Sequence, residues 1–163
     1  MNIIITNRVN LEEGHLWVPD NIAVISITDP SESFVNLSMI ESRVPKLRLV
    51  FHDIDDIEIA KKYKLVHFTK QMANEIIYWL SLVRCENIET AVIQCNAGIS
   101  RSAGVAAAIA LIINGDDSVI FNDKRYLPNR LVYRTILEVF YGYYYEQYVD
   151  VKEWRRDYVE DLF

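Results

Sequence analysis

The sequence predicts an α/β fold with a central, mostly parallel sheet flanked by helices, and three observations predict it. Short runs rich in isoleucine and valine precede segments whose apolar residues recur at helical spacing. A cysteine and an arginine six residues apart stand between a strand pattern and an alanine-rich helix pattern. The length of 163 residues and the apolar content of 51% suffice for one hydrophobic core. We therefore expect a single domain over 1–163, with a C-terminal helical extension over about 143–163.

Four apolar runs predict the strands. Residues 2–6 and 22–28 are both rich in isoleucine and valine, and an Asp-Pro pair ends the second run with a turn signal. Residues 46–51 alternate polar and apolar side chains before the run becomes apolar, which suits a third strand. A fourth strand is predicted over 91–94, directly before the cysteine.

Two long helices are predicted from apolar spacing. Over 69–84 the apolar residues form one stripe, and Thr69 is a suitable N-cap. The stripe consists of Met72, Ile76, Trp79, Leu80 and Val83. Residues 102–113 are apolar on nearly every side, which places this helix in the middle of the fold, and Gly115 ends it.

Shorter helical signals follow. Residues 116–118 can cap a short helix that runs to Phe121, and a Pro-Asn pair at 128–129 opens another helix over 131–141. Residues 143–163 are acidic and aromatic, and we expect them to be helical and to pack on the domain or on a partner.

The chemistry concentrates in one segment between the fourth strand and the next helix. Its residues are Cys95, Asn96, Ala97, Gly98, Ile99, Ser100, Arg101 and Ser102. A helix N-terminus leaves backbone N–H groups unpaired, and its dipole favours negative charge. Gly98 permits backbone angles that side chains forbid, and Arg101 can clamp two oxygens of a tetrahedral anion. The same field favours the thiolate of Cys95, so the segment predicts an oxyanion site with its own nucleophile.

This Cys-x5-Arg-Ser pattern, with glycine at the third loop position, resembles the phosphate-binding signature of the cysteine-dependent protein tyrosine phosphatases. Its mid-chain place resembles the dual-specificity branch, and the resemblance extends over about 22–141. It implies a protein tyrosine phosphatase-like fold and a phosphoprotein phosphatase that forms a phosphocysteine on Cys95. It further implies that residues 96–101 bind the phosphate and that the Ser102 hydroxyl assists departure of the thiolate.

One position departs from the family pattern. Gln94 stands where the family usually has a histidine that orders the loop and helps to keep the thiolate ionised. A glutamine can still hydrogen-bond the loop backbone but carries no positive charge. We therefore expect weaker stabilisation of the thiolate than in the family, and not an inactive site.

Hydrolysis also requires a general acid, because an alkoxide or phenoxide leaves poorly unless it is protonated. In the resembling family the acid is an aspartate on the loop after the strand that precedes the long helix. Asp53, Asp55 and Asp56 all follow the third predicted strand. Asp53 is nearest the strand end and is our preferred general acid. It lies 42 residues before Cys95, which is more than is usual in dual-specificity enzymes, so all three remain candidates.

Composition limits the classes of molecule that this protein is expected to bind. A net charge of −6 argues against nucleic acid and against membrane surfaces. The loop over 96–100 has no lysine, which disfavours polyphosphorylated inositol lipids. A phosphorylated protein, with phosphotyrosine as the default and phosphoserine or phosphothreonine as further possibilities, or a small phosphomonoester, is the expected substrate.

Other features bear on location and cofactors. The longest apolar run is too short to span a bilayer, and the start of the chain lacks the pattern of a secretory leader. Three histidines show no ligand spacing, so we expect no metal and no cofactor. Cys85 and Cys95 cannot form a disulfide framework, and a reactive thiolate needs a reducing compartment, which favours a cytoplasmic protein.

Two other functions fit the same segment. A rhodanese-like sulfurtransferase also uses a cysteine loop before a helix, but it needs no general acid. A catalytically weak phosphate-binding module would capture a phosphorylated partner without turnover, with Gln94 as the sign of relaxed activity.

Overall fold

The computed structural model describes residues 1–15, 19, 21–37 and 45–148, and its centre is a parallel sheet. The strands are β1 (Asn2–Asn7), β2 (Ile22–Thr28), β3 (Lys46–Val50) and β4 (Thr90–Cys95). Within the described residues they form a four-stranded sheet in the order β1-β4-β2-β3, and every neighbouring pair is parallel. The predicted α/β class with a parallel sheet is confirmed.

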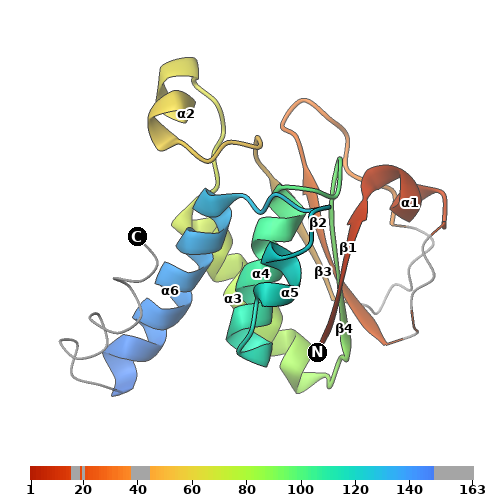
Figure 1. Ribbon diagram of the computed structural model, residues 1–163, viewed down its shortest axis with the longest axis vertical. Coiled ribbons are helices and arrows are strands. Elements are labelled where there is room, and N and C mark those ends of the chain that lie inside the picture. Colours follow the sequence, from red (N-terminus) through yellow and green to blue (C-terminus); the bar gives the residue numbers. More distant parts are fainter. Residues whose placement is uncertain (16–18, 20, 38–44, 149–163) are drawn as a thin grey trace.

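Helices cover both faces of this sheet. The long helices α3 (Lys70–Cys85), α4 (Arg101–Asn114) and α6 (Arg130–Tyr148) lie on one face, and the short helix α1 (Arg8–Glu12) lies on the other (Figure 1). Because α4 is the middle layer of the helical side, every residue from Arg101 to Ala110 is buried. The small residues of this helix let it lie close against the sheet.

The alternation of side chains along β4 decides which core each residue joins. Ala91, Ile93 and Cys95 belong to the larger core beneath the long helices, whereas Val92 belongs to the smaller core on the α1 side. Burial of an isoleucine such as Ile93, which is fully buried, stabilises the fold by about 2 kcal/mol. The cysteine therefore points toward the helices and not toward α1.

Local signals in the sequence set several boundaries. Thr69 accepts a hydrogen bond from the backbone N of Met72 at 3.3 Å and so caps α3, as its residue type predicts. Gly115 ends α4 with φ of 73°, in the left-handed region. The helix α6 continues beyond the predicted 131–141 as far as Tyr148, and the rest of the expected C-terminal extension lies outside the described residues.

Two helices were not predicted, α1 and α2 (Ile57–Tyr63). Each has fewer than two full turns, so neither carries enough apolar residues for a periodic stripe. Local caps start them instead: Asn7 accepts from the backbone N of Asn10, and Asp56 accepts from the backbone N of Glu58 and of Ile59. The short α5 (Ser118–Phe121) was predicted, and it follows a carboxylate of Asp116 that accepts from the backbone N of Ser118.

Candidate active site

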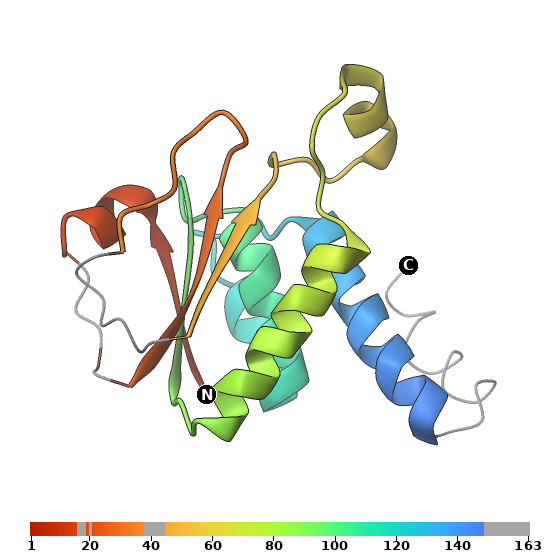
Figure 2. The same ribbon diagram turned by 180° about the vertical axis from the view of Figure 1, so that it is seen from behind.

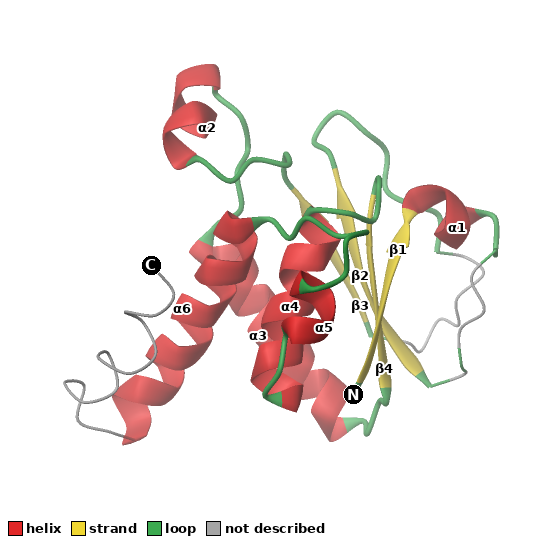
Figure 3. Cartoon of the chain, in the orientation of Figure 1, coloured by secondary structure: helices red, strands yellow, loops and turns green. Residues whose placement is uncertain are grey.

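Three loops meet at one edge of the sheet, because the carboxyl ends of parallel strands lie together. Asp29 follows β2, Asp53 follows β3, and Cys95 is the last residue of β4. Figure 3 shows these loops at the same end of the molecule as the first turn of α4. The edge therefore gathers the predicted nucleophile, arginine and acid candidates.

The sulfur of Cys95 is held at the start of α4. Its side chain is 2% exposed, and Sγ accepts a hydrogen bond from the backbone N of Gly98 at 3.3 Å. The hydroxyl of Ser102 lies 3.1 Å from the same sulfur. Both groups can donate hydrogen bonds to a thiolate. These bonds replace the solvent that a buried thiolate would otherwise lack.

Gly98 is required by the loop for two reasons. Its φ of 70° lies in the left-handed region, where side chains are strained. A Cβ at this position would also lie 2.8 Å from the backbone carbonyl carbon of Thr6 and 2.9 Å from the backbone N of Asn7. The loop is thus packed directly on the end of β1, and only glycine fits there.

Arg101, the first residue of α4, is 4% exposed and is held from two sides. Its Nη1 donates to the carbonyl oxygen of Phe51 at 2.8 Å, and its Nη2 donates to Oδ2 of Asp29 at 2.9 Å. Its Nε is buried and has no hydrogen-bond partner within the described part of the chain. Oδ2 of Asp53 lies 4.0 Å from Nε, which is too far for a hydrogen bond. The guanidinium is oriented, and one of its donors remains available to an anion.

The three aspartates after β3 have different surroundings. Oδ1 of Asp53 accepts from Oγ of Ser100 at 2.8 Å and from Nδ2 of Asn129 at 2.9 Å, so this carboxylate lies against the loop. Asp56 caps α2 instead, and Asp55 is exposed. The interval that separates Asp53 from Cys95 contains α2 and α3. Of the three candidates, Asp53 alone has a described contact with the loop.

Several residues of this edge were missed by the sequence analysis. Asp29 holds Arg101, and the side-chain amide of Asn96 donates to Asp29 at 2.8 Å and to Glu32 at 2.7 Å. Asn129 was noted as part of the Pro-Asn pair that opens a helix, without a role in the site. It contacts Asp53 and caps α6 by accepting from the backbone N of Val132. The usable signal was position, since polar residues directly after parallel strands converge at one edge.

Gln94 does not take the place in the loop that we considered for it. Its side chain is fully buried, and Oε1 accepts from the hydroxyl of Ser26 on β2 at 2.8 Å. Among the described residues its Nε2 has no hydrogen-bond partner. Adjacent residues of a strand point to opposite faces of the sheet, so Gln94 points away from the face that holds Cys95. It therefore stabilises the sheet rather than the loop.

The loop presents a small apolar rim to solvent. Ala97 and Ile99 are exposed, the latter by 41%, whereas Gly98 is buried. Leu127, 74% exposed, donates its backbone N to the carbonyl oxygen of Ile99 at 3.0 Å and so lies beside it. The part of a ligand that extends out of the loop would therefore lie beside these side chains.

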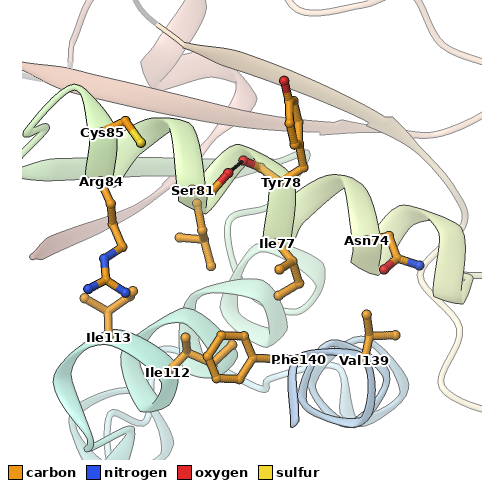
Figure 4. Close-up of a pocket in the computed structure, with 11 residues that line it drawn as sticks. Asn74, Ile77, Tyr78, Ser81, Arg84, Cys85, Ile112, Ile113, Val139 and Phe140 are labelled. Carbon is orange, nitrogen blue, oxygen red and sulfur yellow. Dashed lines mark hydrogen bonds between the residues drawn. The ribbon is translucent and has the colours of Figure 1, made fainter. Parts of the chain in front are cut away.

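A pocket of about 550 Å³ lies elsewhere, between α3, α4 and α6 (Figure 4). Its lining includes Ile77, Ile112 and Phe140, and it contains none of the loop residues. Cys85, which is exposed, also lines it. Cys85 ends α3 shortly before β4 begins, whereas Cys95 is the last residue of β4, so the two thiols lie toward opposite ends of that strand.

Two general features concern the whole described chain. None of its helices is both long enough and apolar enough to cross a membrane. Among the same residues, no group of three or more histidine, cysteine, aspartate or glutamate side chains is arranged to hold a metal ion.

Comparisons with known proteins give one consistent result, which concerns the fold. No family model and no curated protein sequence matches this chain. A mouse protein described as a dual-specificity phosphatase, complexed with zinc tungstate, has a TM-score of 0.59 at 14% identity and covers 88% of this chain and 85% of its own. Human DUSP28 has a TM-score of 0.56 at 12% identity over 89% of this chain and 95% of its own. The human tyrosine phosphatase-like serine/threonine/tyrosine-interacting protein has a TM-score of 0.52 at 18% identity, over 88% of this chain and 93% of its own.

The chain has the fold of the cysteine-dependent phosphatases. In fold it is similar to proteins of the dual-specificity-like branch, which is the resemblance that the mid-chain cysteine loop indicates. At identities of 12% to 18%, this structural similarity shows the fold alone.

Proposed function

We propose that this protein hydrolyses phosphomonoesters through a phosphocysteine intermediate on Cys95, and that its substrate is phosphotyrosine in proteins. The observation that carries the proposal is the buried Nε of Arg101, which has no hydrogen-bond partner among the described residues and belongs to the same loop segment as the buried Cys95. An unpaired donor on a buried charge is costly unless an anion completes it. A phosphate dianion seated in the loop supplies that anion.

In the first step the thiolate of Cys95 attacks phosphorus. A P–S bond forms, the bond between phosphorus and the ester oxygen breaks, and the leaving oxygen takes a proton from Asp53. Arg101 and the loop N–H groups balance the charge on the phosphoryl oxygens. Support for Asp53 comes from its contacts with Ser100 and Asn129, which hold it beside the loop.

In the second step water attacks the phosphocysteine. The carboxylate of Asp53 accepts a proton from this water, a P–O bond forms, and the P–S bond breaks to release phosphate and the thiolate. The hydroxyl of Ser102, 3.1 Å from the sulfur, donates to the departing thiolate and so favours its release.

The substrate class follows from the rim and the charge. The loop has no lysine to pair with additional phosphates, and its exposed side chains, Ala97 and Ile99, are apolar. An aromatic ring packs well on such side chains, which favours phosphotyrosine over phosphoserine. The mouse protein of the same fold is complexed with zinc tungstate, and tungstate, like phosphate, is a tetrahedral oxyanion.

The deciding experiment is hydrolysis of p-nitrophenyl phosphate against pH by the unmodified protein and by Cys95→Ser. We expect a bell-shaped profile that the substitution abolishes, with a loss of about 10³-fold or more. Capture of a phosphotyrosine peptide by the unmodified protein without turnover would instead identify a phosphate-binding module. Transfer of sulfur from thiosulfate to cyanide would identify a sulfurtransferase.

A second comparison tests the general acid. Asp53→Asn should slow phenyl phosphate, a poor leaving group, by about 10²-fold or more and slow p-nitrophenyl phosphate much less. Asp55→Asn is the matched control, since Asp55 follows the same strand and is exposed like Asp53, but among the described residues it has no contact with the loop. Equal losses on both substrates for Asp53→Asn would reject the assignment.

A further inference from the structure

The helix α2 and the residues after it form a projection that the catalytic proposal does not use. Figures 1 and 2 show α2 standing out from the body at the end where the loops after β2, β3 and β4 meet. Nearly all of residues 57–66 are exposed, and Ala60 is the buried exception among those of α2. We call residues 57–66 the projection.

The base of the projection is fixed beside Asp53. The backbone N of His52 donates to the carbonyl oxygen of Val66 at 2.8 Å, and the backbone N of Val66 donates back to Nδ1 of His52 at 3.1 Å. Below them, the rings of Phe51 and Phe68 pack edge to face at 5.1 Å within the core. These contacts give the projection a defined position relative to the general acid.

The exposed side chains of the projection are of two kinds. Four are apolar and each is between 39% and 62% exposed: Ile57, Ile59, Tyr63 and Val66. Three are lysines, Lys61, Lys62 and Lys64, against a single carboxylate, Glu58. Scattered apolar residues on a surface need no explanation, but four within ten residues beside a binding site form a patch that a partner can cover.

We propose that the projection docks the phosphoprotein substrate through a segment near the phosphorylated residue that carries apolar and acidic side chains. This proposal rests on the proposed function, which it deepens by adding a recognition surface. Charge complementarity selects the occupant, because the acidic neighbours Asp55 and Asp56 lie at the N-terminal start of α2, whereas the lysines lie at its C-terminal end. Lys61 is paired with Glu58 at 2.7 Å, which leaves Lys62 and Lys64 to meet an acidic partner. The apolar side chains supply contact area, and the lysines select acidic partners.

A protein segment is favoured over a membrane surface. Binding to anionic lipid gains about 1 kcal/mol per basic residue, and a chain of net charge −6 is repelled as a whole by such a surface. A peptide segment can contact the lysines at the C-terminal end of α2 alone, whereas a lipid surface faces the acidic molecule as a whole.

The test compares phosphotyrosine peptides that differ only in their flanks, which are rich in Glu and Leu, in Lys and Leu, or in Gly and Ser. The double variants Ile59→Ser/Tyr63→Ser and Lys61→Glu/Lys62→Glu alter the projection without touching the loop. Val119→Ser and Arg84→Glu are matched controls at exposed positions on α5 and at the far end of α3. The measured quantities are kcat/KM for each peptide and for p-nitrophenyl phosphate.

For the unmodified protein we expect the Glu-Leu peptide to exceed the Gly-Ser peptide about tenfold in kcat/KM, through KM. Each projection variant should lose most of that preference, the lysine variant should shift it toward the Lys-Leu peptide, and hydrolysis of p-nitrophenyl phosphate should stay unchanged. The controls should behave as the unmodified protein. Equal peptide preferences in all variants would overturn the proposal.

Binding separates this proposal from the proposed function. Fluorescence anisotropy of the same peptides on Cys95→Ser requires no turnover, so weaker binding to Ile59→Ser/Tyr63→Ser in that background supports docking even if the chain hydrolyses nothing. Retention on phosphatidylserine–phosphatidylcholine vesicles, lost in the projection variants and without peptide preference, would overturn a protein partner in favour of a membrane.

Discussion

Nη2 of Arg101 donates to Oδ2 of Asp29 at 2.9 Å, and this contact joins the end of β2 to the start of α4. The Arg101 side chain is 5% exposed and that of Asp29 is 24% exposed, so the pair is largely shielded from solvent. The carboxylate thus compensates a buried charge, and under the proposed function it would share that charge with the phosphate of the substrate.

Asp29→Asn should therefore destabilise the protein and strengthen phosphate binding. The amide can still accept from Nη2, but it no longer neutralises Arg101, so we expect a loss of about 2 kcal/mol in the free energy of unfolding. Inorganic phosphate should inhibit the variant severalfold more strongly, because a neighbouring negative charge is gone. Urea unfolding and phosphate inhibition constants measure the two effects.

Glu32→Gln is the matched control for that change. Glu32 also accepts from Asn96, but its ion pair with Arg8 is more exposed, with 41% of the Glu32 side chain accessible. Its removal should cost less than about 1 kcal/mol. A loss as large as that of Asp29→Asn would show that the pairing with Arg101 is not the cause.

Gly98→Ala should abolish the loop geometry. The new Cβ would lie 2.8 Å from a backbone atom of Thr6, which cannot move without shifting β1, and φ of 70° adds strain. We expect a loss of more than about 2 kcal/mol in stability, or a displaced loop with activity reduced at least tenfold. Thermal unfolding and kcat/KM on p-nitrophenyl phosphate measure the outcome.

Gly14→Ala isolates the backbone contribution to that effect. Gly14 has φ of 68°, but among the described residues no atom lies within 4 Å of the Cβ that it would gain. This variant should lose only about 1 kcal/mol and keep its activity. If both alanine variants behaved alike, the packing of Gly98 on β1 would be irrelevant.

Asn129→Ser should impair protonation of the leaving group more than it impairs folding. Serine can still cap α6 by accepting from the backbone N of Val132, but the amide that donates to Asp53 and to the carbonyl oxygen of Ile54 is lost. We expect kcat on phenyl phosphate to fall about tenfold, kcat on p-nitrophenyl phosphate to fall less, and stability to change by about 1 kcal/mol or less. A uniform decrease on both substrates would indicate a structural role alone.

Tyr133 should make stability depend on pH in the alkaline range. The pKa of this phenol lies well above the usual value near 10. Burial is the larger cause, and the hydrogen bond to Asp117 at 2.5 Å is the second. Because the folded pKa exceeds the unfolded one, the contribution is fully present below about pH 10 and is lost as the pH rises toward the folded pKa. Tyr133→Phe should remove this part of the pH dependence of the free energy of unfolding. Urea unfolding of both proteins between pH 8 and pH 11 would measure the difference.

Much of the fold was accessible from local pattern. The strand over 22–28 was predicted with its observed bounds. Four of the five stripe residues of α3 are buried and Met72 is partly buried, because apolar periodicity reports directly which face is buried. The short helices α1 and α2 could not be predicted from this pattern. In α2, a cap at Asp56 and one full turn carry too little periodicity to be distinguished from an acidic loop.

For the candidate site too, local sequence predicts some residues and leaves others undecided. Cys95, Gly98 and Arg101 are contiguous, and the geometry of a strand, a tight loop and a helix start follows from their own spacing. The choice among Asp53, Asp55 and Asp56 does not, because it depends on Ser100 and Asn129, which are 47 and 76 residues from Asp53.

The sequence by itself thus determined the α/β class and the short loop that places a thiol and a guanidinium between a strand and a helix, because these depend on residues close together in the chain. Only the tertiary structure decided that Asp29 holds Arg101 across 72 residues, that Gln94 faces the sheet, and that α2 projects beside the acid. The physical reason is that parallel strands bring their carboxyl ends to one edge whatever the length of the connections between them.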